Sequence, residues 1–138
     1  MWPGTGLLLR EEIDLHMQRA AEKLEAAKYL FEGEYYNDAA SRAYYSMFHA
    51  ASALLLTKDI APFTHRELIK KFGLEFVKQD IIDEWYAKAL RNQKDMRELG
   101  DYDVTRDITE DEAEQLIENA KRFLDEIEDA IESLADDE

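Results

Sequence analysis

The sequence contains no cysteine, and only two prolines and five glycines occur among its 138 residues. Without cysteine, neither a disulfide framework nor a zinc site of the thiolate type can form, and the composition fits a reducing compartment. No apolar run is long enough to cross a bilayer, and residues 1–10 lack the basic segment that opens a signal peptide. We therefore expect a cytoplasmic protein with no membrane partner.

Basic residues are also scarce. There are 17 lysines and arginines against 32 aspartates and glutamates, which gives a net charge of −15. Residues 101–138 hold 16 of the acidic residues and three of the basic ones. A protein that binds nucleic acid over a large surface needs a basic surplus somewhere. We therefore expect no DNA partner, and any contact with RNA has to be local and to work against a repulsive background.

Apolar residues recur at helical spacing along the chain, and no segment alternates with the period of a strand. The pattern predicts a short helix and four long ones. The short helix is expected over 68–77, and the long helices over 7–31, 35–57, 81–99 and 109–134. Short connections make neighbouring helices antiparallel. The predicted fold class is all-α, an up-and-down bundle of four long helices plus one short helix.

Several helix boundaries are predicted from local signals. Gly33 and Gly100 are expected to follow helix ends. Thr64 and Thr109 each begin a capping box, with a glutamate three residues later, and Asn37 or Asp38 can cap the second helix. The chain length corresponds to one domain over residues 1–138. Within that domain we expect a flexible N-terminus at 1–6 and a frayed acidic tail at 135–138.

The stretch 35–57 is the most apolar of these helices, yet it contains Arg42 and His49. Their spacing of seven residues puts them on one face, two turns and roughly 10.5 Å apart along the axis. Tyr45 and Ser46 lie between them on nearly the same face. In one interpretation, Arg42 reaches an acidic neighbour and His49 is a hydrogen-bonded core histidine. In the other, these side chains line a polar cleft.

An imidazole and a guanidinium provide the groups that RNA cleavage without a metal requires. Imidazole gives or takes a proton near neutral pH, and guanidinium binds phosphate and stabilises charge on its oxygens. One helix offers one histidine, so a two-fold dimer is expected to bring a second His and Arg alongside. His16, His49 and His65 lie on separate elements without the spacing of a zinc or di-iron site, so we expect no metal and no cofactor.

Residues 41–51, SRAYYSMFHAA, preceded by YYNDAA at 35–40, closely resemble the core helix of HEPN domains (higher eukaryotes and prokaryotes nucleotide-binding). The likeness is greatest to small stand-alone prokaryotic members with an S-R-A-Y-Y-x-M-F-H-A signature. It extends to Thr64-His65, to Arg97 before Asp101-Tyr102, and to an acidic last helix. The resemblance implies a bundle of four to five helices, usually dimeric, and pairing with a minimal nucleotidyltransferase in a toxin–antitoxin-like module.

In active HEPN members, an Arg and a His separated by four to six residues form a ribonuclease site at the dimer interface. Arg42 and His49 match this motif. Ala43 replaces the polar residue that often follows the Arg. Ala51 stands where some members carry a tyrosine that the partner adenylylates, so the resemblance leaves open whether this control applies here.

The resemblance therefore predicts a toxin-type, metal-independent endoribonuclease that acts as a homodimer and is paired with a minimal nucleotidyltransferase antitoxin. Arg42 and His49 would be catalytic, with Tyr45 and Ser46 in support. The alternative is a non-catalytic nucleotide-binding or adaptor subunit of a nucleotidyltransferase complex. The RNA target, the nucleotide and the partner's identity stay open.

Overall fold

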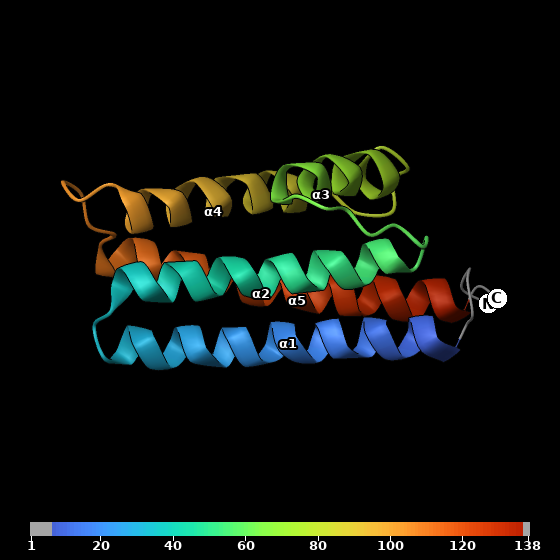
Figure 1. Ribbon diagram of the computed structural model, residues 1–138, viewed down its shortest axis with the longest axis horizontal. Helices are drawn as coiled ribbons and strands as arrows, with labels where there is room; N and C mark the ends of the chain where they lie inside the picture. The colour runs from blue at the N-terminus through green and yellow to red at the C-terminus, as the bar shows by residue number, and fades with distance from the viewer. Residues whose placement is uncertain (1–6, 137–138) are drawn as a thin grey trace.

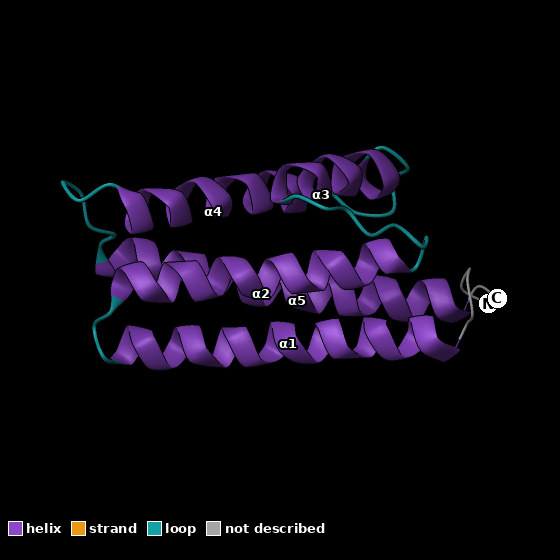
Figure 2. Cartoon of the chain, viewed as in Figure 1, coloured by secondary structure: helices purple, strands orange, loops and turns teal. Residues whose placement is uncertain are grey.

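The computed structural model describes residues 7–136, which are mainly helical and contain no strand. The elements are α1 (Leu7–Glu32), α2 (Tyr36–Leu56), α3 (His65–Phe72), the π-helical turn η1 (Gly73–Val77), α4 (Glu84–Tyr102) and α5 (Glu110–Asp136). The four long helices run lengthwise beside one another, and short α3 lies beside the first half of α4 (Figures 1 and 2). The predicted all-α bundle of four long helices and one short helix is confirmed.

Helix α2 is the centre of the bundle, because it packs against α1, α4 and α5. Figure 1 shows it between α1 and α4, with α5 behind it. Its alanines are buried and let the neighbouring helices come close, while larger apolar side chains fill the space between them. The larger buried side chains of α2 are Tyr44, Met47, Leu54, Leu55 and Leu56. None of the described helices is both long and apolar enough to span a membrane.

The capping box predicted at Thr109 forms in full, and of the box predicted at Thr64 the hydroxyl half forms. At the start of α5, the Thr109 hydroxyl accepts a hydrogen bond from the Glu112 backbone N–H (3.1 Å), and the Glu112 carboxylate accepts one from the Thr109 N–H (3.0 Å). At α3, the Thr64 hydroxyl accepts from the Glu67 N–H at 3.0 Å. These caps satisfy backbone donors that the first helical turn leaves free.

The predicted cap of α2 by Asn37 or Asp38 is wrong. Tyr35 occupies the cap position and its side chain makes no cap hydrogen bond. Asn37 turns instead to the loop before α5, where its amide donates to Asp107 Oδ1 (3.2 Å) and its carbonyl oxygen accepts from the Ile108 N–H (2.8 Å). Asn37 thereby ties the start of α2 to a segment about 70 residues later in the chain.

Helix α4 differs from its predicted span at both ends. It begins at Glu84 after Asp83, whose carboxylate accepts from the Trp85 N–H at 2.9 Å, and it continues through Gly100 to Tyr102. Gly100 therefore does not end the helix. A β-carbon at this position would lie 3.1 Å from Ile108 Cγ1, so the missing side chain makes room for the loop before α5.

Candidate functional site

Arg42 is exposed at the surface of α2, although the sequence predicts a mostly buried helix. Within residues 7–136 its guanidinium makes no hydrogen bond and no ion pair, so the acidic neighbour considered above is not found in this part of the chain. A guanidinium without a carboxylate partner keeps its planar set of donors free for a phosphate.

His49 is half-buried and contacts a second histidine. Its Nδ1 lies 3.1 Å from Nδ1 of His16 on α1, with the ring centroids 5.4 Å apart. Because α1 and α2 are antiparallel, Lys23 and Arg42, each seven residues from its histidine, lie at the same level of the bundle. The face between α1 and α2 thus combines two imidazoles with the two cations.

The charges around this pair favour neutral imidazoles. Burial lowers the pKa of His49 to about 4, and His16, Lys23 and Arg19 act in the same direction. Burial also lowers the pKa of His16, against which Glu12 acts. In the described part of the chain, Arg19 and Lys23 have no acidic partner. We refer to His16, Arg19, Lys23, Arg42 and His49 as the α1–α2 face; it brings together three cations on a protein of net charge −15, and Glu12 is the acidic group that acts on its His16.

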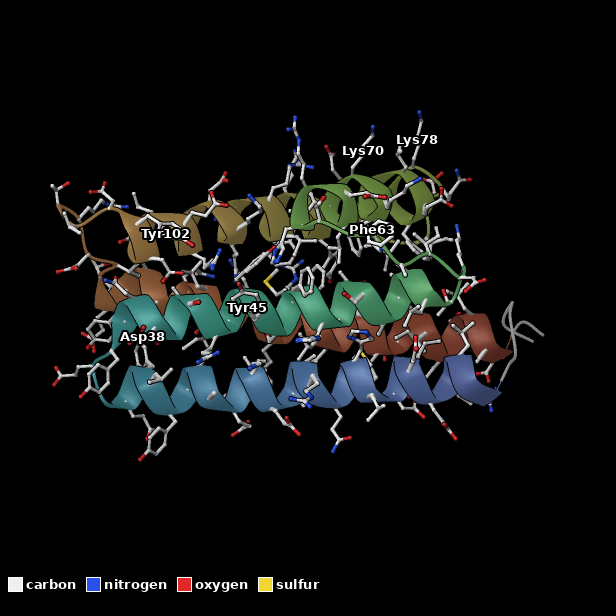
Figure 3. The ribbon with its side chains drawn as sticks, viewed as in Figure 1. Asp38, Tyr45, Phe63, Lys70, Lys78 and Tyr102 are labelled. Atoms are coloured by element: carbon white, nitrogen blue, oxygen red, sulfur yellow. The ribbon has the colours of Figure 1, made fainter. Side chains whose placement is uncertain are left out.

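The two supporting residues predicted between Arg42 and His49 lie elsewhere. Ser46 is fully buried, and its hydroxyl donates to the Ala43 carbonyl oxygen at 2.8 Å. Tyr45 lies along the side of α2 toward α4 (Figure 3), where the Arg97 guanidinium stands 5.1 Å from the centre of its ring. The structure therefore brings neither Tyr45 nor Ser46 to the α1–α2 face.

A second polar cluster joins α2, α3 and α4. His65 Nδ1 lies 2.7 Å from the Tyr44 hydroxyl, and its ring stacks on Phe48 with centroids 4.3 Å apart. Arg97 Nε lies 3.0 Å from Asp101 Oδ2, and the Arg97 side chain is only 18% exposed. Burial lowers the pKa of His65, and Arg97 adds to this effect.

This His65 cluster was not among the predicted site residues. The Thr64 cap places His65 at the first position of α3, and that much could be foreseen. The contact of His65 with Tyr44 depends on how α3 docks on α2, which no sequence spacing reports. The described residues contain no group of three histidine, aspartate or glutamate side chains arranged to hold a metal ion.

Comparison with known proteins identifies the wider group. The HEPN domain family matches residues 13–130. A Methanocaldococcus jannaschii protein named "Putative toxin" is 44% identical over 91% of this chain and 93% of its own length. A second protein of that organism, with the same description, is 37% identical over 86% of this chain and 80% of its own length. A Thermotoga maritima "UPF0332 protein" is 34% identical over 88% of this chain and 92% of its own length.

Proposed function

Because the chain belongs to the HEPN domain family, we propose that it is a toxin-type, metal-independent endoribonuclease. It acts as a homodimer and is restrained by a minimal nucleotidyltransferase partner. The observation that carries the proposal is the α1–α2 face, where the exposed and unpaired guanidinium of Arg42 accompanies the half-buried, neutral imidazole of His49. The toxin description of two similar archaeal proteins supports the same conclusion.

The chemistry follows from these two groups. A neutral imidazole accepts the proton of the RNA 2′-hydroxyl, and the 2′-oxygen attacks the adjacent phosphorus. The bond from phosphorus to the 5′-oxygen breaks, and that oxygen takes a proton from an acid. Arg42 holds the phosphoryl oxygens and stabilises the charge that develops on them. The products are a 2′,3′-cyclic phosphate and a 5′-hydroxyl.

Charge supports a local contact with single-stranded RNA. The α1–α2 face carries Arg19, Lys23 and Arg42, none of them paired with an acid in the described residues, whereas the chain as a whole is strongly acidic. A flexible strand can bring one phosphate to this face and keep the rest of its charge away from the acidic helices. A long duplex would meet stronger repulsion.

The dimer has a chemical role in this proposal. Arg42 and His49 are separated by about two helical turns, roughly 10.5 Å along the axis of α2. A two-fold copy of the face would bring an arginine of one protomer toward the histidine of the other. Light scattering at micromolar concentration should give the dimer mass, and a monomer mass would contradict this part of the proposal.

A non-catalytic nucleotide-binding or adaptor subunit is the second candidate, and the net charge of −15 favours it. Incubation of the purified protein with single-stranded RNA separates the two. The ribonuclease proposal predicts cleavage that leaves cyclic phosphate ends, is lost in His49→Ala and is kept in the control Arg91→Ala, an exposed cation of α4. Nucleotide binding that depends on Arg42, without any cleavage, would support the adaptor instead.

A further inference from the structure

The contact between His16 and His49 joins two imidazoles from different helices of one chain. Their Nδ1 atoms are 3.1 Å apart, a hydrogen-bond distance. Both rings are half-buried, so each retains access to solvent. The charged groups that act on the pair all come from α1: Glu12 acts on His16, and Arg19 and Lys23 act on His49. From α2, the Phe48 ring meets His49 edge to face at 5.8 Å.

A hydrogen bond between two neutral imidazoles fixes their tautomers relative to each other. One ring must carry its proton on Nδ1, and the other must present a lone pair there. In the first ring Nε2 is then a free base, and in the second ring Nε2 carries a proton. The bond between the Nδ1 atoms therefore gives the pair one proton acceptor and one proton donor at its two Nε2 atoms.

We propose that His16 and His49 of the same chain form an acid–base relay, in which a proton crosses between their Nδ1 atoms during RNA cleavage. This inference rests on the proposed function and extends it by naming His16. The second imidazole then comes from α1 of the same protomer, and the partner protomer is not needed to supply it.

The relay balances in protons and bonds. The ring with a free Nε2 takes the 2′-hydroxyl proton as the 2′-oxygen bonds to phosphorus. Its Nδ1 proton moves to Nδ1 of the other ring, and that ring gives its Nε2 proton to the departing 5′-oxygen. Both rings end neutral with their tautomers interchanged. The half-buried rings restore the starting tautomers by exchange with water.

The environment suits such a relay. Burial holds the pKa of both rings below the ordinary value, and Lys23 and Arg19 add to this effect at His49, so the pair rests neutral at pH 7 and can accept a proton. A pair held as imidazolium would have no free base. The same cations lie where they can attract the phosphate whose bonds change.

The kinetic test compares His16→Gln with the wild-type protein and with the control Gln18→Ala, an exposed residue of α1. His16→Gln should lower kcat for RNA cleavage about 100-fold or more and remove one limb of its pH profile. Binding of an uncleavable 2′-deoxy oligonucleotide and the melting temperature should change little. Wild-type kcat and an unchanged pH profile in His16→Gln would overturn the relay, even if His49→Ala is inactive. If the wild-type protein cleaves nothing, the proposed function fails first.

A second measurement does not depend on activity or on a variant that folds. Nitrogen NMR of the wild-type imidazoles at pH 7 should show one ring of the pair protonated at Nδ1 and the other at Nε2. Finding both rings as the Nε2–H tautomer would exclude the hydrogen bond and would overturn the relay.

Discussion

Replacing His49 should change how the stability of the protein depends on pH. Burial lowers the pKa of His49 in the folded protein from 6.5 to about 4. Between these values the unfolded chain binds more protons than the folded protein, so acid favours unfolding. Above pH 6.5 the ring is neutral in both states and the full free energy of unfolding is present. As the pH falls toward 4, protonation of His49 in the unfolded chain lowers the free energy of unfolding. His49→Gln removes the titrating group and with it this dependence.

The magnitude follows from the same two values. The difference between the ordinary pKa of 6.5 and the folded-state pKa of about 4 corresponds to about 3 kcal/mol of free energy of unfolding before solvent screening is considered. Between pH 7 and pH 5 about 2 kcal/mol of this would be lost, and solvent screening of a half-exposed ring halves it. We therefore expect the wild-type protein to lose about 1 kcal/mol more than His49→Gln over this interval.

Urea unfolding at pH 7 and at pH 5 measures this difference. The carboxylates of Glu98, Asp103 and Glu112 and the imidazole of His65 also have a lowered pKa, but both proteins carry them, so their contributions cancel in the comparison. Gln18→Ala serves as the control and should behave like the wild-type protein. Equal losses of stability in the wild-type protein and His49→Gln would show that burial does not hold the ring neutral, and would refute the reasoning.

Three further predictions concern packing and hydrogen bonds. Leu55→Ala, at a fully buried position, should lower the free energy of unfolding by about 2–5 kcal/mol, and Thr109→Ala by about 0.5–2 kcal/mol; equal losses in urea melts would contradict this ranking. Asn37→Ala leaves the Ile108 N–H without its acceptor. It should lower the free energy of unfolding by about 1–2 kcal/mol and speed hydrogen exchange at that amide. Unchanged exchange would mean that contacts other than this hydrogen bond fix the loop before α5. Gln93 is buried, and neither its amide nitrogen nor its amide oxygen has a hydrogen-bond partner in the described structure. Gln93→Leu should therefore raise the melting temperature. A lower melting temperature would mean that the amide has a bound partner, such as water.

The features that could be predicted from the sequence are those that depend on near neighbours in the chain. The capping box at Thr109 needs only a glutamate three residues later, and the shared face of Arg42 and His49 needs only helical spacing. Features that depend on docking could not be predicted. Gly100 resembles a helix end, but its small size serves the close approach of Ile108.

In the candidate site, too, the features that depend on how helices pack could not be predicted from the sequence. Helical spacing placed Ser46 near Arg42, but the helix turns the Ser46 hydroxyl into the core. His16 and His49 are 33 residues apart, and their contact depends on the register of two antiparallel helices. No spacing within one helix could indicate that pair. The docking of α3, which brings His65 to Tyr44, is likewise absent from any local pattern.

Cleavage of single-stranded RNA by the purified, partner-free protein in EDTA tests the central claim most directly, with Arg42→Lys as the variant. The ribonuclease proposal predicts cleavage by the wild-type protein despite the chelator, because imidazole and guanidinium supply the chemistry. It also predicts that Arg42→Lys loses most of this activity, since lysine keeps the charge but lacks the planar pair of donors. Cleavage that requires added metal, or that survives unchanged in both Arg42→Lys and Arg42→Ala, would contradict it.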